Sequence, residues 1–159
     1  MPFDPSLLLF VPADRPDRFG KALASDASGA ILDLEDAVSP DRKAFARDQV
    51  RAFLNTQDDL DRVAIRINPA ETPDGHADLE MLATVPRPAA LVVPKVSRTG
   101  DVLRITAAVG DVPLIPIIET AGGVVRCVEI AETDEVLALA FGPYDLAAEL
   151  GGESTEDVM

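Results

Sequence analysis

Six short apolar runs divide this chain, and each run ends at polar or charged residues. Segments long enough to form helices separate the runs, so strands and helices are expected to alternate. Apolar runs of this length, rich in Val, Ile and Leu, are typical of strands buried on both faces of a parallel sheet. The predicted strands are Leu7–Pro12, Ala30–Leu34, Val63–Asn68, Ala90–Lys95, Leu114–Thr120 and Val136–Phe141. In parallel α/β folds the ligand site lies beyond the carboxyl ends of the strands, so polar residues at these ends indicate an enzyme.

The spacing of the predicted strands leaves two α/β folds open. Strand starts fall every 22 to 33 residues. A (β/α)₈ barrel of about 250 residues allots about 31 residues to each unit. The 159 residues therefore hold only about six β/α units, which an open doubly wound sheet would accommodate as a complete fold. The polar residues at the strand ends favour the barrel, and either fold predicts one domain over residues 1–159.

Charge and composition exclude several classes of protein. The net charge of −14 argues against nucleic acid as a partner, because phosphates require a basic surface. No run approaches the ~18 apolar residues of a membrane span, and the N-terminal residues do not resemble a signal peptide. The one cysteine, Cys127, cannot form an internal disulfide, which fits a reducing compartment. We therefore expect a cytoplasmic protein that binds neither nucleic acid nor a membrane.

Charged residues fall within the predicted strands at positions where they need partners. Because side chains alternate between the two faces of a strand, Asp33 and Glu35 share a face, and Arg66 and Asn68 share the inward face of the third strand. Buried charges are costly unless they are paired or bind a metal. One interpretation is a purely structural layer of ion pairs, in which Arg66 and Lys95 pair with Asp33 or Glu35. The other is a catalytic site.

Two carboxylates follow the fifth and sixth predicted strands, Glu119 and Asp145. Such a pair suits Mg²⁺, which takes one or two carboxylates and leaves its other positions to water and substrate oxygens. A bound Mg²⁺ can polarise a carbonyl and stabilise an enolate oxygen. Arg66 could then hold a substrate carboxylate with its planar guanidinium. The one histidine, His76, lies in a polar loop or helix start, where we expect it to be solvated.

A basic patch lies where the first helix is expected to begin. Arg15, Arg18 and Lys21 are spaced three residues apart. They form either a solvated helix face or a site for the phosphates of a substrate that carries a nucleotide. The sequence alone leaves both interpretations open.

Several segments together resemble a known family. These segments are LLFVPADRPDRFGKA, AILDLEDAVSPDRKAFAR, VAIRINP, LVVPKV, IPIIETAGGV and ALAFGPYDLAAELGG. In this order they resemble the motifs of the citrate lyase β-subunit family of the HpcH/HpaI aldolase superfamily, which includes citryl-CoA, malyl-CoA and citramalyl-CoA lyases. The resemblance covers nearly the whole chain and implies a TIM barrel, of which about six β/α units are present here. Strands seven and eight of the family have no counterpart before Met159, so we expect a piece of a longer gene product or an assembly that covers the open edges.

The resemblance also implies roles for individual residues. Glu119 and Asp145 match the two Mg²⁺ ligands of the family, and Arg66 matches the arginine that binds the oxo acid. Glu35 and Asp36 match the acidic pair beside the metal, where they act through its water ligands. The remaining matches, in the coenzyme A segment and at the end of strand four, are Arg15, Arg18, Lys21 and Lys95.

The implied activity is a Mg²⁺-dependent carbon–carbon lyase that cleaves a 3-hydroxyacyl-CoA thioester to an oxo acid and acetyl-CoA. The family implies a homo-oligomer, a trimer or hexamer. One alternative is a class II pyruvate-type aldolase of the same superfamily, but Asp36 stands where those enzymes carry a histidine. The other alternative is an inactive barrel fragment, which the missing strands motivate.

Overall fold

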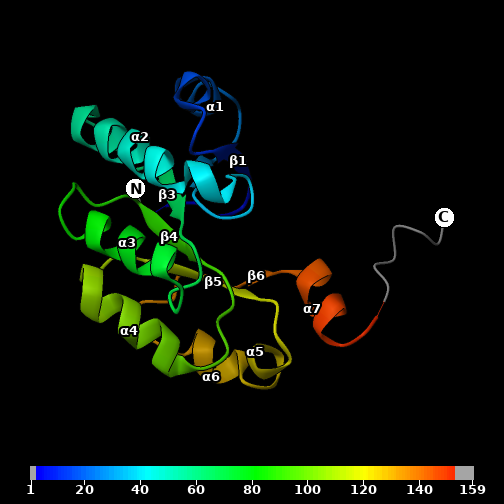
Figure 1. Cartoon of the computed structure of the whole chain (residues 1–159). Coiled ribbons are helices and arrows are strands. Elements are labelled where there is room, and N and C mark those ends of the chain that lie inside the picture. Colours follow the sequence, from blue (N-terminus) through cyan, green and yellow to red (C-terminus); the bar gives the residue numbers. More distant parts are fainter. Residues whose placement is uncertain (1–2, 153–159) are drawn as a thin grey trace.

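The fold is built around one parallel sheet, whose six strands follow each other in chain order (Figure 1). This computed structural model describes residues 3–152. The strands are β1 (Leu8–Pro12), β2 (Gly29–Asp33), β3 (Val63–Arg66), β4 (Ala90–Val93), β5 (Leu114–Ile118) and β6 (Ala140–Phe141). The α-helices are α1 (Phe19–Leu23), α2 (Lys43–Thr56), α3 (Pro73–Leu82), α4 (Thr99–Val109), α5 (Ala121–Val125), α6 (Cys127–Ala131) and α7 (Pro143–Glu149). Short 3₁₀ helices, Pro16–Arg18 and Pro40–Arg42, lead into α1 and α2.

Two apolar layers lie on the two faces of the curled sheet. The larger layer joins the outer face to the helices and includes Leu32, Ile65 and Leu91, all fully buried. The smaller layer lies on the inner face, where all its members except Phe3, which precedes β1, come from alternate positions of the strands. It consists of Phe3, Ile31, Ala64, Ala90, Val92, Ile115 and Ile117. Strands buried on both faces, in sequential order and with helices outside, confirm the prediction of a partial TIM barrel of six units.

The strand register brings the predicted site residues level with one another. Asp33, at the end of β2, is the register partner of Arg66, at the end of β3. Side chains of register partners in parallel strands point to the same face, so both lie on the inner face at the carboxyl end. Asn68 differs from the prediction. It follows the end of β3, where strict alternation stops, and hydrogen-bonds Asp78 of α3 instead of facing inward.

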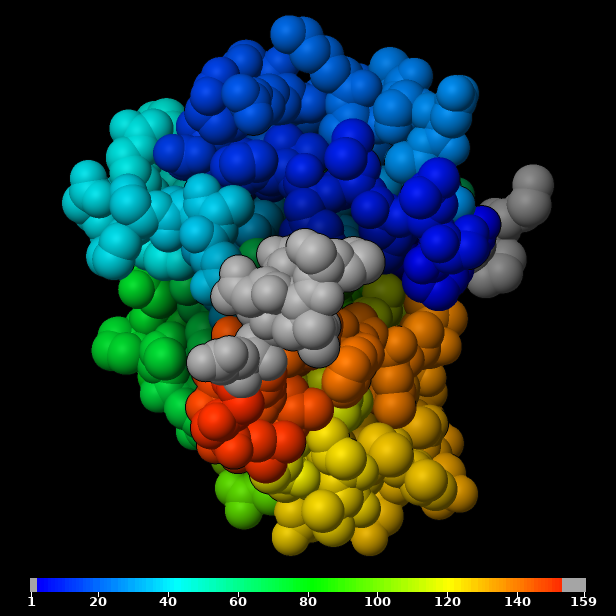
Figure 2. Space-filling view, turned by 90° about the vertical axis from the view of Figure 1, so that its right-hand side faces the viewer, coloured from blue at the N-terminus to red at the C-terminus, as the bar shows by residue number. Residues whose placement is uncertain are grey.

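The first and last strands form the two edges of the sheet in the described part of the chain. Apolar side chains are exposed along both edges, including Leu9 and Phe10 on β1 and Leu139 and Phe141 near β6. Figure 2 shows the residues of the N-terminal units in one half of this side of the molecule and those of the C-terminal units in the other. No helix within residues 3–152 is long and apolar enough to cross a membrane.

Candidate functional site

A cavity of about 510 Å³ opens at the carboxyl ends of the strands. Its walls come from opposite edges of the sheet, because Phe10 of β1 and Phe141 of β6 both line it. Ile31, Val92, Ile115 and Ile117 form its apolar floor. The charged residues that line it are Asp36, Arg66, Glu119 and Asp145. An apolar cavity with a few convergent charged groups is the usual form of a small-molecule site.

Arg66 is held at the mouth of this cavity by acidic residues that follow β2. Its Nε and one terminal nitrogen donate to the two oxygens of Asp33, at 2.7 and 2.6 Å. Its other terminal nitrogen lies 3.1 Å from Glu35 Oε2 and 3.5 Å from Asp36 Oδ2. The guanidinium also lies over the ring of Phe10, 4.9 Å from its centroid. Two-point pairing with Asp33 fixes the plane of the guanidinium and thus its orientation toward the cavity.

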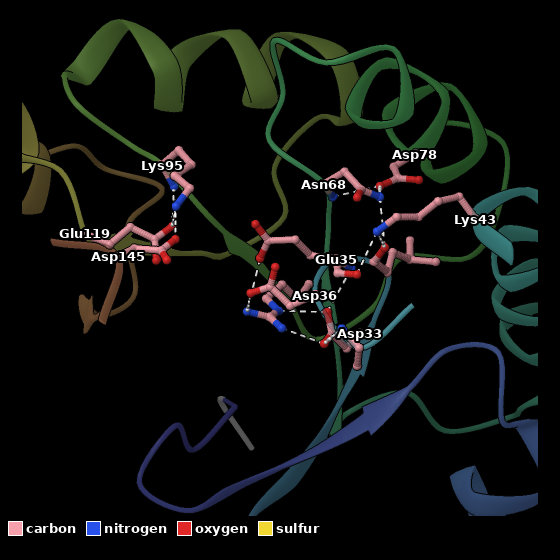
Figure 3. Close-up of polar contacts among 12 residues, drawn as sticks. Asp33, Glu35, Asp36, Lys43, Asn68, Asp78, Lys95, Glu119 and Asp145 are labelled. Atoms are coloured by element: carbon pink, nitrogen blue, oxygen red, sulfur yellow. Dashed lines mark hydrogen bonds and ion pairs between the residues drawn. The ribbon is translucent and has the colours of Figure 1, made fainter. Parts of the chain in front are cut away.

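Asp33 organises the turn that carries the other two acids (Figure 3). Its side chain is buried and accepts hydrogen bonds from the backbone N–H groups of Glu35, at 2.9 Å, and Ala37, at 3.2 Å. Each oxygen therefore serves both Arg66 and the turn. The ion-pair layer considered from the sequence exists for Asp33, Glu35 and Arg66, but Lys95 is not part of it.

Glu35 has an unusual protonation equilibrium. Burial raises its pKa to about 7, because the charged carboxylate loses hydration. The charge of Arg66 opposes this shift, while the neighbouring carboxylates of Asp36, Glu119 and Asp33 add to it. This carboxyl group can therefore gain or lose a proton near neutral pH.

Lys95 joins the two carboxylates on the other side of the site (Figure 3). Its ammonium contacts Asp145 and lies 3.8 Å from Glu119 Oε1, and its backbone N–H donates to the same Glu119 oxygen at 2.8 Å. Lys95 has a φ of 58°, a left-handed conformation that is uncommon for a residue other than glycine. Such strain is typical of residues that the surrounding structure holds in place at functional sites. Here it directs both donors of Lys95 toward Glu119.

Gly142 allows Glu119 to reach this position. A Cβ atom at residue 142 would lie 2.6 Å from Glu119 Oε2 and 2.7 Å from Glu119 Cβ. These distances are shorter than van der Waals contact, so a side chain at this position would displace the carboxylate. Gly142 lines the cavity directly after β6, and only glycine fits there without moving Glu119.

The donor set around Lys95 fits a hard divalent cation. Glu119 and Asp145 both contact one ammonium group, so their oxygens already converge on a single cation. Within residues 3–152 no three His, Cys, Asp or Glu side chains converge as a metal cluster. Two carboxylates with no further protein ligand suit Mg²⁺, which keeps several positions for water and substrate oxygens.

The basic patch divides into two parts. Arg18 and Lys21 line a second hollow, of about 370 Å³, along the edge of β1. Arg15 instead pairs with Asp17, with 3.1 Å between Arg15 Nε and Asp17 Oδ1, and does not line that hollow. Phe10 lines both hollows, so this basic hollow lies next to the main cavity.

Sequence similarity connects this site with characterised proteins. Residues 6–159 match the family described as HpcH/HpaI aldolase/citrate lyase. The chain belongs to this family. It is 42% identical over 147 residues to the citrate lyase subunit beta-like protein of Mycobacterium tuberculosis, covering 92% of this chain and 50% of that protein. It is 38% identical over 151 residues to a (3S)-malyl-CoA thioesterase of Cereibacter sphaeroides, covering 94% of this chain and 53% of that protein. The chain thus spans about half the length of these curated relatives.

Solved structures of the family share this fold. The citrate lyase beta subunit of M. tuberculosis complexed with oxaloacetate and magnesium matches with a TM-score of 0.82 and 39% identity, over 93% of this chain and 62% of that one. A complex of the M. tuberculosis protein with magnesium, acetoacetate and coenzyme A matches with the same TM-score and identity, over 94% of this chain and 52% of that one. The M. tuberculosis protein thus binds Mg²⁺, an oxo acid and coenzyme A.

Sequence reasoning did not identify every residue that shapes the site. It missed Lys43 and Asp78, which are buried and charged, because charged side chains are expected at the surface. It also missed Gly142, since a glycine after a strand is common and only the position of Glu119 shows what it does. The one signal in the sequence was that Gly142 lies three residues before the predicted metal ligand Asp145, within the segment FGPYD.

Proposed function

We propose that this chain carries the Mg²⁺ and oxo-acid site of a carbon–carbon lyase acting on a 3-hydroxyacyl-CoA thioester of the citryl-, malyl- or citramalyl-CoA type. The observation that carries the proposal is the arrangement of opposite charges around one cavity. Arg66 lies on one side, held by Asp33, and the carboxylates of Glu119 and Asp145 converge on the other. Relatives with this fold bind Mg²⁺ together with oxaloacetate or acetoacetate.

Each charged group has a separate task in this proposal. Glu119 and Asp145 would hold Mg²⁺, which as a Lewis acid offsets negative charge on substrate oxygens. Arg66 binds the carboxylate of the oxo-acid half, because its guanidinium is planar and already oriented by Asp33. Lys95 balances the negative charge of these two carboxylates, and a cation bound between them would take the place of its ammonium.

The proposed cleavage requires one proton to leave and one to arrive. A base removes the proton of the 3-hydroxyl group, and this oxygen becomes the carbonyl of the oxo acid as the bond between C2 and C3 breaks. The electron pair of that bond passes to the thioester enolate, which takes a proton at carbon to give acetyl-CoA. The acidic groups that we place next to the reacting atoms are Asp36, which lines the cavity, and Glu35, whose pKa is about 7.

The thioester half of the substrate is proposed to extend along β1. The hollow with Arg18 and Lys21 adjoins the main cavity and carries two positive charges in a chain with a net charge of −14. Phosphate groups of coenzyme A would be attracted there. Arg15 lies at the same end of β1, beside Asp17.

A second activity is favoured by one comparison, the 38% identity to a (3S)-malyl-CoA thioesterase. Hydrolysis of malyl-CoA produces malate and the free thiol of coenzyme A. The lyase reaction produces glyoxylate and acetyl-CoA, without a free thiol. Incubation of the protein with malyl-CoA and Mg²⁺, with separate assays for glyoxylate and free thiol, distinguishes the two reactions.

We expect Mg²⁺-dependent release of an oxo acid from at least one of citryl-, malyl- and citramalyl-CoA. Glu119→Gln is expected to abolish this release, since a neutral amide is a poor Mg²⁺ ligand. Full turnover by that variant would show that Glu119 is not a ligand. Release of free thiol without an oxo acid would indicate a thioesterase instead of a lyase. If neither product is released, the chain is an inactive barrel fragment.

A further inference from the structure

Lys43 is a buried lysine whose ammonium hydrogen-bonds only neutral groups in the described part of the chain. It is the first residue of α2, and 8% of its surface is exposed. Its Nζ donates to the backbone oxygens of Leu34, at 2.7 Å, and Glu35, at 2.6 Å. Within residues 3–152 it forms no ion pair. A charge this deeply buried without a counter-ion is costly, so its two contacts call for an explanation.

The two carbonyls that Lys43 contacts belong to the turn that carries the acids of the site. The peptide group between Leu34 and Glu35 accepts from Lys43 through its oxygen and donates through its N–H to Asp33 Oδ1, at 2.9 Å. Asp33 Oδ1 in turn accepts from Arg66 Nε at 2.7 Å. A cation on the carbonyl polarises the peptide group and strengthens the hydrogen bond that its N–H donates. A continuous hydrogen-bonded path therefore joins Lys43 to the guanidinium of Arg66.

Asn68, in the segment between β3 and α3, is a second donor to the Leu34 carbonyl (Figure 3). Asn68 Nδ2 donates to Leu34 O at 3.0 Å and to Asp78 Oδ2 at 2.8 Å. Asp78 is fully buried and also accepts from the Asn68 backbone N–H at 2.8 Å and from Arg47 at 3.2 Å. Burial raises the pKa of Asp78, while these hydrogen bonds oppose that shift. This network fixes the turn to both α2 and α3.

From this geometry we propose that Lys43 is a positioning residue for the oxo-acid site. It acts through the Leu34–Glu35 peptide and sets the orientation of Asp33, and thereby of Arg66, without contacting the ligand itself. Asn68 supports the same carbonyl from the other side. The inference rests on the proposed function in one respect: the ligand that Arg66 binds is taken to be an oxo acid.

One readout of this proposal does not depend on the ligand. In ¹H–¹⁵N spectra, the amide proton of Glu35 should lie downfield, because it donates to Asp33 from a polarised peptide. Lys43→Met keeps the length and apolar stem of the side chain but removes the ammonium. It is expected to move the Glu35 amide proton upfield, whereas Arg51→Met, which removes an exposed charge from the same helix, is not. An unchanged Glu35 amide in folded Lys43→Met would overturn the proposal.

The second readout is oxaloacetate binding, measured by calorimetry in the presence of Mg²⁺. Lys43→Met is expected to weaken binding by 10-fold or more, and Arg51→Met by less than 2-fold. Asn68→Ala should weaken it less, and the double variant Lys43→Met/Asn68→Ala should fall short of the product of the two factors, because both residues act on Leu34 O. Wild-type affinity in Lys43→Met would refute the role of Lys43. Absence of oxaloacetate binding by the wild type would instead refute the proposed function, and the spectral test would still decide the role of Lys43.

A variant that retains part of the side chain covers the case in which Lys43→Met does not fold. Lys43→Ala removes three methylene groups and an ammonium, which n-propylammonium reproduces. With this cation bound, Lys43→Ala is expected to recover the native Glu35 amide position and oxaloacetate affinity, while sodium at equal ionic strength should not restore them. A variant that folds with n-propylammonium but recovers neither property would refute the proposal.

Discussion

Substitution of Gly142 by alanine tests how tightly the metal site is built. The new Cβ would lie 2.6 Å from Glu119 Oε2, 2.7 Å from Glu119 Cβ and 3.1 Å from Ile117 Cγ2. An ordinary contact between carbon atoms is about 3.5–4.0 Å, so the Glu119 side chain has to move by roughly 1 Å. Mg²⁺ holds its oxygen ligands at about 2.1 Å, and a displacement of this size removes a carboxylate from its coordination shell.

We therefore expect Gly142→Ala to weaken Mg²⁺ binding by at least about 10-fold, equivalent to roughly 1.4 kcal/mol. Overpacking should also lower the free energy of unfolding by about 1–3 kcal/mol. Calorimetric titration with Mg²⁺ measures the first effect and urea unfolding the second. Gly20→Ala is the matched control, because a Cβ at residue 20 meets nothing within 4 Å. Wild-type Mg²⁺ affinity in folded Gly142→Ala would show that Glu119 does not bind the metal from the position seen here.

Three further substitutions test separate parts of the structure. Lys95→Met removes the ammonium that competes with the cation for Glu119 and Asp145. Because the ion pair between Lys95 and Asp145 is partly exposed, the gain should be modest: a Mg²⁺ titration should show roughly fivefold tighter binding, or about 1 kcal/mol. Glu35→Gln removes a carboxyl group whose folded pKa is raised from 4.5 to about 7. In metal-free buffer the protonated Glu35 stabilises the folded wild type below pH 4.5, and this stabilisation is lost as the pH rises through 7. The unfolding free energy of Glu35→Gln relative to wild type should therefore rise by about 2 kcal/mol between pH 4.5 and pH 8. An unchanged difference would contradict the raised pKa. Arg62→Met removes the donor to four backbone carbonyls of residues 23–28, at the end of α1 and in the segment that follows it. Urea unfolding should show a loss of about 1 kcal/mol, while Arg51→Met should change stability little.

The strand pattern predicted the inner face of the sheet well because alternation depends only on local extended geometry. Ile31 lies in the inner apolar layer, and Asp33 at the end of β2 pairs with Arg66, as their predicted face implied. Glu35 also reaches Arg66, but from the turn after β2. The same reasoning failed for Asn68, which follows β3 and turns toward α3. A pattern along the sequence holds only as long as the backbone stays extended.

The last strand shows a second limit of sequence reasoning. The apolar run Val136–Phe141 predicted six residues of strand, but β6 contains only Ala140–Phe141, and Val136 forms an isolated bridge with Leu114. Among the described strands β6 has one neighbour, β5, so only one of its edges is hydrogen-bonded. The run has the composition of a central strand, but pairing with neighbours decides how much of it becomes strand.

The partners of Lys95 could not be predicted from the sequence either, although those of Arg66 were. Lys95 was considered a partner of Asp33 or Glu35, yet it pairs with Glu119 and Asp145. The choice depends on the left-handed backbone of Lys95, which directs its donors toward β5. The family resemblance, by contrast, included the four charged residues that line the cavity, Asp36, Arg66, Glu119 and Asp145, because it compares whole motifs and does not depend on distances between strands. The roles that it implies for them stay predictions.

The central claim is that Glu119 and Asp145 hold Mg²⁺ opposite Arg66, so that one oxo acid contacts both. The dependence of oxaloacetate affinity on Mg²⁺ tests this claim most directly. Calorimetric titration of the protein with oxaloacetate, once with Mg²⁺ and once with EDTA, is predicted to show at least about 10-fold tighter binding with the metal. Equal affinity under both conditions would contradict the claim, because the metal and the oxo acid would then occupy independent sites.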